Sequence, residues 1–372
     1  GMDWTLPQYL QIMLGQIAPK MTPEEVYFAT LLGALECIEN GITTVWDWSH
    51  IMNTPEHTEA AIKGLRDSGI RALFGYGTPG TSVWEWFYES QKYHPIEAKE
   101  VKQKYFTSTD DLVQMSLAIR GPEYSTMEVT RHDIAMGRAL QLPITMHMGC
   151  GTFGAKYKGV QQLAKENLLS SDLNFAHGNY FTEQDLQLIA KTGGSIAMTP
   201  EVEMQMGIGF SNLSNTLKHS IKVGIGVDVV TSCNGSMIDQ MRLLMQTERA
   251  SHHAKAIALG NQPNSMQLNT SALLEVATLG GAKVMGWESS IGSIAVGKRA
   301  DLVMVNPESN LQDYPGGLTG YLLSSFKPNH IKVVMVNGKI QIFEGKSVSF
   351  SINDIRRKLL EISSHHFEGV LP

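Results

Sequence analysis

Residues 144–154 read ITMHMGCGTFG: a short apolar run ends at His147 and is followed at once by glycines. Two later runs end in the same way, LNFAHGN around His177 and GIGVDVV around Asp228. Imidazole and carboxylate groups suit Zn²⁺ or Fe²⁺ when they meet around open coordination positions. The pattern therefore favours a fold that brings the ends of several strands to one place.

Helical and β-rich segments alternate from Glu24 to about Ala258. The helical segment TPEEVYFATLLGALECIENG begins at a Thr22-Pro23 cap signal and ends at Gly41. Seven β-rich runs lie between such segments: ITTVWDW, IRALFGYG, LVQMSLAIRG, PITMHMG, LNFAHGN, GSIAMTPE and KVGIGVDVV. This alternation predicts βα units and a parallel sheet.

Two parallel architectures fit the alternation, a doubly wound sheet and a TIM barrel. A doubly wound sheet usually has a glycine-rich phosphate loop after its first strand, and the sequence shows none. A barrel gathers polar residues from the C-terminal ends of its strands. The seven runs end in such residues, namely Asp47 with His50, Tyr76, Arg120, His147, His177, Glu201 and Asp228. We therefore predict a barrel over residues 2–285.

The pattern changes after residue 260. NTSALLEVATLGGAKVMGW predicts a helix, and IGSIAVGKRADLVMVNP and IKVVMVNGKIQIFEGKSV predict antiparallel strands. Asn337-Gly338 is a strong hairpin signal within the second of these. We expect a small β appendage over 286–350 and an amphipathic helix over 351–372.

Composition limits the partners and the compartment. The 372 residues are 42% hydrophobic and 18% charged, with a net charge of −6 and no basic cluster, so we expect no nucleic-acid partner. Apolar runs stay below the roughly 18 residues of a membrane span, so we expect no membrane partner. Three cysteines (Cys37, Cys150, Cys233) form no disulfide framework and suit the cytoplasm. Gly1 before Met2 is typical of a scar left by tag removal.

From these motifs the sequence resembles the amidohydrolase superfamily, in its cytosine-deaminase and chlorohydrolase-like branch. ATLGGAKVMGWESSIGSIAVGKRADLVMV resembles the family's ending, a helix followed by a strand pair of a composite β-sandwich. LNFAHGNYFTEQDLQLIAKTGGSIAMTP is similar to its sixth strand, helix and seventh strand. The resemblance implies that His147 and Asp228 are metal ligands and that His177 contacts either the metal or its water. It also implies that 286–350 is a remnant of the sandwich.

The chain departs from the family pattern at its start. Family members carry His-x-His on the first barrel strand, and this sequence contains no His-x-His. We therefore expect an N-terminally truncated chain, either a gene fragment or a shortened gene model, whose barrel lacks its first strand. A divalent Zn or Fe ion would then be weakly held or absent. The unpaired sheet edges would favour a homo-oligomer.

A second departure follows His147. Family deaminases carry His-x-x-Glu there, whereas this chain has Cys150 in place of the glutamate. A thiol with a pKa near 8.5 replaces that acid poorly. Glu201 and Glu203 in TPEVEMQMGIG could take over proton transfer or substrate recognition, or both could be solvated loop acids. We assign Glu201 to catalysis, and Glu203 and Cys150 to substrate binding.

The remaining polar candidates are weaker. His50 follows a strand and is assigned to substrate contact. Arg120 either binds a polar substrate group or pairs with an acid. The pairs His252-His253 and His365-His366 fall in predicted helices, where we expect surface residues.

We therefore expect a metal-dependent hydrolase that cleaves a non-peptide C–N bond in a small cyclic nitrogen compound. His177, Asp228 and Glu201 are its catalytic candidates, and a small molecule is its substrate. Chlorohydrolase-type displacement is the alternative chemistry. A catalytically silent scaffold or assembly subunit with the same fold is the alternative function.

Overall fold

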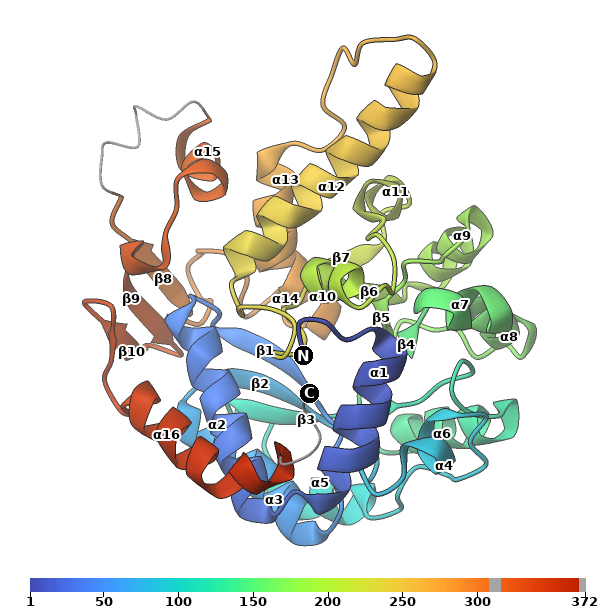
Figure 1. Ribbon diagram of the computed structural model, residues 1–372, viewed down its shortest axis with the longest axis vertical. Coiled ribbons are helices and arrows are strands. Elements are labelled where there is room, and N and C mark those ends of the chain that lie inside the picture. Colours follow the sequence, from blue (N-terminus) through green and yellow to red (C-terminus); the bar gives the residue numbers. More distant parts are fainter. Residues whose placement is uncertain (308–315, 368–372) are drawn as a thin grey trace.

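A seven-stranded parallel sheet lies at the centre of the computed structural model, which describes residues 1–307 and 316–367 (Figure 1). Its strands stand in chain order: β1 (Thr44–Ser49), β2 (Arg71–Tyr76), β3 (Val113–Ile119), β4 (Ile144–Met148), β5 (Leu173–His177), β6 (Ser195–Met198) and β7 (Lys222–Ile225). Each predicted β-rich run contains one strand, so the prediction of a parallel α/β sheet is confirmed. The sheet curls as part of a barrel, and among the described residues β1 and β7 form its edges.

Helices surround the sheet, and the sequence explains where the first of the long helices begins and where the next one ends. Thr22 and Glu25 form a capping box at the start of α2 (Pro23–Glu39), and Gly69, at φ 76°, ends α3 (Pro55–Ser68). The later connections use α5 (Ala98–Tyr105), α6 (Met127–Ala139), α7 (Gly151–Tyr157), α8 (Gly159–Lys165), α9 (Glu183–Thr192), α10 (Pro200–Gln205) and α11 (Leu213–Lys218). Alternating helices and strands place the C-terminal ends of all seven strands at one side of the sheet.

The N-terminal segment lies over that side. It comprises α1 (Leu6–Tyr9), a π-helix (Leu10–Ile17) and a 3₁₀ turn (Ala18–Lys20). Leu10 and Leu14 pack with Trp86 of α4 (Val83–Phe87), and the Leu6 N–H donates to the Met206 carbonyl at 3.0 Å. The segment therefore forms part of the wall around the strand ends.

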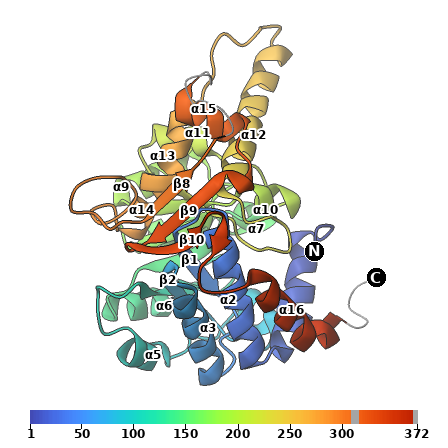
Figure 2. The same cartoon turned by 90° about the vertical axis from the view of Figure 1, so that its left-hand side faces the viewer.

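A second, antiparallel sheet stands beside β1 and β2 (Figure 2). Its order is β11 (Lys346–Ser347), β10 (Lys339–Phe343), β9 (Ile331–Val336) and β8 (Leu302–Val305). The predicted hairpin is confirmed, with Asn337 and Gly338 at φ 50° and 77°. The strand expected from residue 291 begins only at Leu302, because the preceding residues form turns around Lys298 and Arg299. Residues 308–315 of this predicted appendage lie outside the described residues.

The C-terminal helix packs against α2. Ile352 of α16 (Ile352–Ser363) lies in one apolar cluster with Leu31 and Leu35, and a 3₁₀ turn (Ser364–Phe367) follows. The predicted helix over 351–372 is therefore shorter, and its residues 368–372 lie outside the described part. The other helices are α12 (Met237–Ala258), α13 (Thr270–Glu275), a π-helix (Val276–Gly280), α14 (Gly281–Met285) and α15 (Gly317–Ser324). None of the described helices is long and apolar enough to span a bilayer.

Candidate active site

The C-terminal ends of β4, β5 and β7 bring together His147, His177 and Asp228. His147, the last residue but one of β4, lies next to His177 at the end of β5, with ring centroids 5.4 Å apart and planes 22° apart. His177 Nε2 lies 3.9 Å from Oδ2 of Asp228, which follows β7. The parallel sheet thus positions two imidazoles and one carboxylate at one edge.

The backbone is strained at two of these positions. His177 has φ 82° and Asp228 has φ 63°, in the left-handed region that glycine normally occupies. Each such residue costs about 1–3 kcal/mol, so the surrounding structure must hold it in place. Strain of this kind gathers at functional sites, which supports a functional role for this edge.

Glu203 and Thr199 fix the ring of His177. Its Nδ1 lies 3.3 Å from Glu203 Oε1 and 3.1 Å from Thr199 Oγ1, which leaves Nε2 facing Asp228. Burial lowers the pKa of His177, but the charges of Glu203, Asp228 and Glu123 outweigh burial and raise it above its ordinary value. A charged imidazole at this position can donate a hydrogen bond to a developing negative charge.

Glu203 is fully buried and is itself held on all sides. Its oxygens accept hydrogen bonds from the Thr199 N–H at 2.7 Å, from Asn179 Nδ2 at 2.8 Å and from the Ser211 hydroxyl. A carboxylate with that many donors is pre-organised to orient the imidazole beside it.

His147 differs from His177 in its charge. Burial lowers the pKa of His147 well below its ordinary value, and the nearby imidazoles of His177 and His50 lower it further. Its ring packs on Trp48 at 3.9 Å between centroids and faces His50 at 5.7 Å. Burial also lowers the pKa of His50 to about 4. Neutral imidazoles keep a lone pair for a metal or a substrate.

The donor types fit a zinc-type ion, since His147 is neutral and Asp228 offers a carboxylate. The ligand atoms stand apart, however. Over residues 1–307 and 316–367, one trio of His, Cys, Asp or Glu side chains has ligand atoms all within 4.8 Å, and it is Glu25, His365 and His366. At the strand ends, the residue types therefore suit zinc, but their ligand atoms do not all lie within 4.8 Å of one another.

The other predicted site residues take different places. His50 stays beside His147, as described. Cys150 is buried with Val202 and Met206, and burial raises the pKa of its thiol well above the ordinary value. Arg120 is only 1% exposed and binds Ser90 Oγ at 2.8 Å and Asp133 Oδ2 at 3.0 Å, which is the acid-pairing alternative.

The two candidate glutamates separate in the structure. Glu203 contacts His177, as described, whereas Glu201 Oε2 accepts a hydrogen bond from Gln240 at 2.8 Å on α12. The assignment of Glu201 to catalysis stays a prediction. Of the two carboxylates, the structure places Glu203 against the candidate catalytic imidazole.

Glu123, in the loop after β3, was not among the predicted site residues. Its carboxylate accepts the Gly149 N–H at 2.6 Å and the Cys150 N–H at 3.3 Å, and so holds the turn that follows His147. Burial raises its pKa to about 7 against those hydrogen bonds. The available signal was an acidic residue in the short loop after a strand, four residues past Ile119.

Comparison with known proteins is consistent with this geometry. The model of the Amidohydrolase family matches residues 2–341, and the chain belongs to this family. It is 25% identical over 371 residues to 5-methylthioadenosine/S-adenosylhomocysteine deaminase of Pyrococcus furiosus, covering 97% of this chain and 83% of that protein. It is 30% identical over 186 residues to guanine deaminase of Mus musculus, covering 47% and 39%.

Solved structures share the fold. An adenosine deaminase from Xanthomonas campestris with bound zinc superposes with a TM-score of 0.78 at 21% identity, covering 99% of this chain and 80% of that chain. Atrazine chlorohydrolase from Arthrobacter aurescens, complexed with zinc, gives 0.82 at 19% identity, covering 97% and 83%. These likenesses confirm the predicted barrel-type fold.

Proposed function

We propose that the protein is a metal-dependent hydrolase of a non-peptide C–N bond in a small cyclic nitrogen compound, with deamination as its reaction. The observation that carries the proposal is His177, held by Glu203 on one nitrogen and facing Asp228 with the other. Deaminases among the relatives, acting on methylthioadenosine/S-adenosylhomocysteine and on guanine, support this substrate class.

The chain's own groups suit the two proton movements of such a reaction. Water forms a bond to the ring carbon, the C–N bond breaks, and the amine leaves as ammonia. Loss of solvation raises the pKa of Asp228, although His177 and Thr199 oppose this shift. Asp228 can therefore take the proton from water and return it to the leaving amine. The Nε2–H of His177 can stabilise negative charge on the ring.

A zinc-type ion supplies Lewis-acid activation of water when it is bound. His147 and Asp228 would hold it, and His177 would lie beside it. Weak retention of zinc or iron by the chain is part of the proposal, and it rests on the spread of ligand atoms described above.

Ammonia release from purified, zinc-supplemented protein tests the proposal. The substrates are adenosine-type nucleosides, guanine and cytosine, and chloride release from a chlorotriazine tests the alternative chemistry. We expect ammonia from at least one compound and a loss of about 100-fold or more with Asp228→Asn or His177→Asn. His219→Asn is the matched control, because His219 also contacts a carboxylate, Glu183, at 2.7 Å. Ammonia release that survives Asp228→Asn would refute the assignment.

A second candidate is a non-catalytic assembly subunit, which the separated ligand atoms favour. Exposed apolar side chains on β8, at Leu302, Val303 and Met304, support a homo-oligomer under either function. The free cysteines support a cytoplasmic location. Sedimentation of the purified chain measures the assembly. An oligomer without ammonia or chloride release, in the presence of bound zinc, would favour the subunit.

A further inference from the structure

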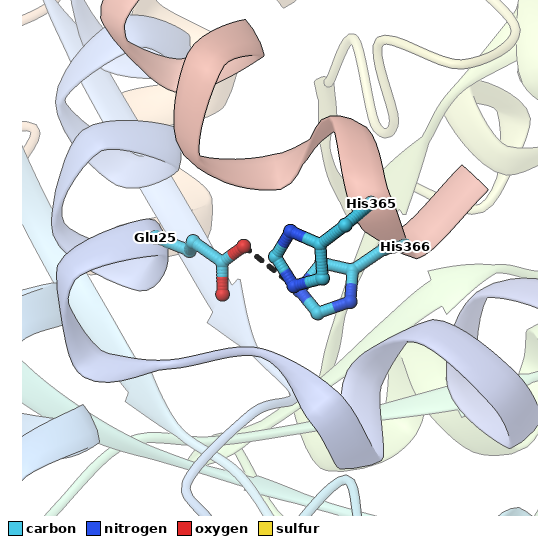
Figure 3. Close-up of side chains that lie close together, drawn as sticks. All are labelled: Glu25, His365 and His366. Carbon is cyan, nitrogen blue, oxygen red and sulfur yellow. Dashed lines mark ion pairs between the residues drawn. The ribbon is translucent and has the colours of Figure 1, made fainter. Parts of the chain in front are cut away.

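Glu25 meets His365 and His366, a pair distant from it in sequence, on the side of the molecule where α16 crosses α2 (Figure 3). Glu25 lies in the first turn of α2, and the two histidines lie in the 3₁₀ turn after α16. From the sequence, we expected His365-His366 on the surface. That expectation is wrong for His366, which is 4% exposed because the turn packs back on α2.

The carboxylate of Glu25 is fixed before any ligand arrives. Its Oε2 accepts the Thr22 N–H at 2.6 Å and the Thr22 hydroxyl at 2.9 Å, as part of the helix cap. The other oxygen, Oε1, is therefore turned toward the histidines. Burial would raise the pKa of Glu25, but the hydrogen bonds from Thr22 and the imidazole of His366 lower it. The group is an anion at neutral pH.

One buried nitrogen of the cluster lacks a partner. Nε2 of His366 and Oε1 of Glu25 are 2.8 Å apart, the dashed contact of Figure 3, and form an ion pair. Nδ1 of His366 is buried without a hydrogen-bond partner. Buried polar groups usually have a partner, so this nitrogen points to one that is missing.

The third side chain completes a ligand set. The ring of His365 lies 3.9 Å from that of His366 between centroids, and the ligand atoms of all three residues lie within 4.8 Å of one another. Two imidazoles and a carboxylate are ligands that zinc accepts, with a remaining position open to water. His365 is exposed and offers a path for the ion from solvent.

We propose that Glu25, His365 and His366 form a zinc site that joins the C-terminal turn to the start of α2. The site uses none of the candidate residues at the strand ends and does not depend on the proposed function. Bound zinc would join two segments about 340 residues apart in sequence, in addition to the apolar contacts of α16. It would therefore stabilise the folded chain.

Zinc titration by calorimetry tests the site in a His147→Ala/Asp228→Ala background, which removes the candidate ligands at the strand ends. We expect one zinc per chain, and at least tenfold weaker binding after His365→Ala. His365 is exposed, so its loss leaves the Glu25–His366 pair and the fold in place. Glu25→Gln keeps a helix-capping oxygen and should weaken zinc binding to a similar degree.

The matched control is His253→Ala, in the chain's other adjacent histidine pair, on α12. It should leave the stoichiometry and affinity unchanged. Zinc should also raise the unfolding temperature of the background protein, and His365→Ala should abolish that rise. No zinc binding in the background protein, or equal binding with and without His365, would overturn the proposal and leave a plain ion pair.

Discussion

Replacing Glu203 with glutamine tests the positioning of His177 most directly. Glu203 is fully buried, and five donors surround it: His177 Nδ1, the Thr199 N–H and hydroxyl, Asn179 Nδ2 and the Ser211 hydroxyl. Glutamine keeps the shape but has one acceptor oxygen, and its amide N–H₂ must face a donor.

The size of the effect follows from those contacts. Removing one partner of a buried ion pair costs about 3–5 kcal/mol, and hydrogen bonds to charged groups contribute about 1.5–3 kcal/mol each. Because glutamine retains one acceptor, we expect a loss near the lower end, about 3 kcal/mol, in the free energy of unfolding. Losing the orienting partner of the imidazole should lower kcat by about 10–100-fold with little change in KM.

The pH profile separates positioning from general destabilisation. Glu203 helps to hold the pKa of His177 above its ordinary value, so the charged imidazole stabilises the fold fully below about pH 6.5. That contribution is lost as the pH rises through the folded-state pKa. In Glu203→Gln the pKa of His177 should be lower. The loss of stability with rising pH, and the accompanying fall in kcat, should therefore occur at lower pH.

Urea unfolding and kcat against pH measure both effects. Glu183→Gln is the matched control, since Glu183 also contacts an imidazole, that of His219, but is exposed. Its unfolding free energy should change by less than about 1 kcal/mol. If Glu203→Gln unfolds like the control and keeps the wild-type pH profile, the positioning argument is refuted.

Further predictions follow from the other contacts. Arg120→Met leaves Asp133 buried without its charged partner and should lower the unfolding free energy by about 3–5 kcal/mol in urea. In a variant lacking His365, calorimetric zinc titration should show weak binding at the strand ends, which His147→Ala or Asp228→Ala should each abolish and Cys150→Ala should leave unchanged. Unchanged zinc binding in the Asp228 variant, or wild-type stability of Arg120→Met, would contradict these assignments.

The strands and the strand-end residues could be predicted because both depend on local pattern. His147 and His177 end apolar runs that are buried in neighbouring parallel strands, so their proximity follows from strand order alone. The contact of Glu203 with His177 could not be predicted. The two residues are 26 positions apart in sequence, and they meet because of where α10 packs in the tertiary structure. From the sequence, Arg120 could either bind a polar substrate group or pair with an acid. Its full burial in an ion pair with Asp133 favours the second role.

The C-terminal turn shows a different limit. His365-His366 ends an amphipathic pattern, and a helical pattern alone places such residues on the surface. The turn instead changes to 3₁₀ geometry at Ser364 and brings His366 against Glu25. That contact spans almost the whole chain and depends on tertiary packing, which local periodicity does not contain.

The left-handed backbone at His177 and Asp228 has a consequence for laboratory evolution. Glycine at position 228 would relieve about 1–2 kcal/mol of conformational strain and remove a poorly solvated carboxylate, so selection for heat resistance alone should enrich it and erase the chemistry. Position 177 should resist the same drift. Losing its imidazole strands the buried charge of Glu203, at about 3–5 kcal/mol, which exceeds the strain relieved. Selection for stability thus retains His177, whereas only selection for activity retains Asp228.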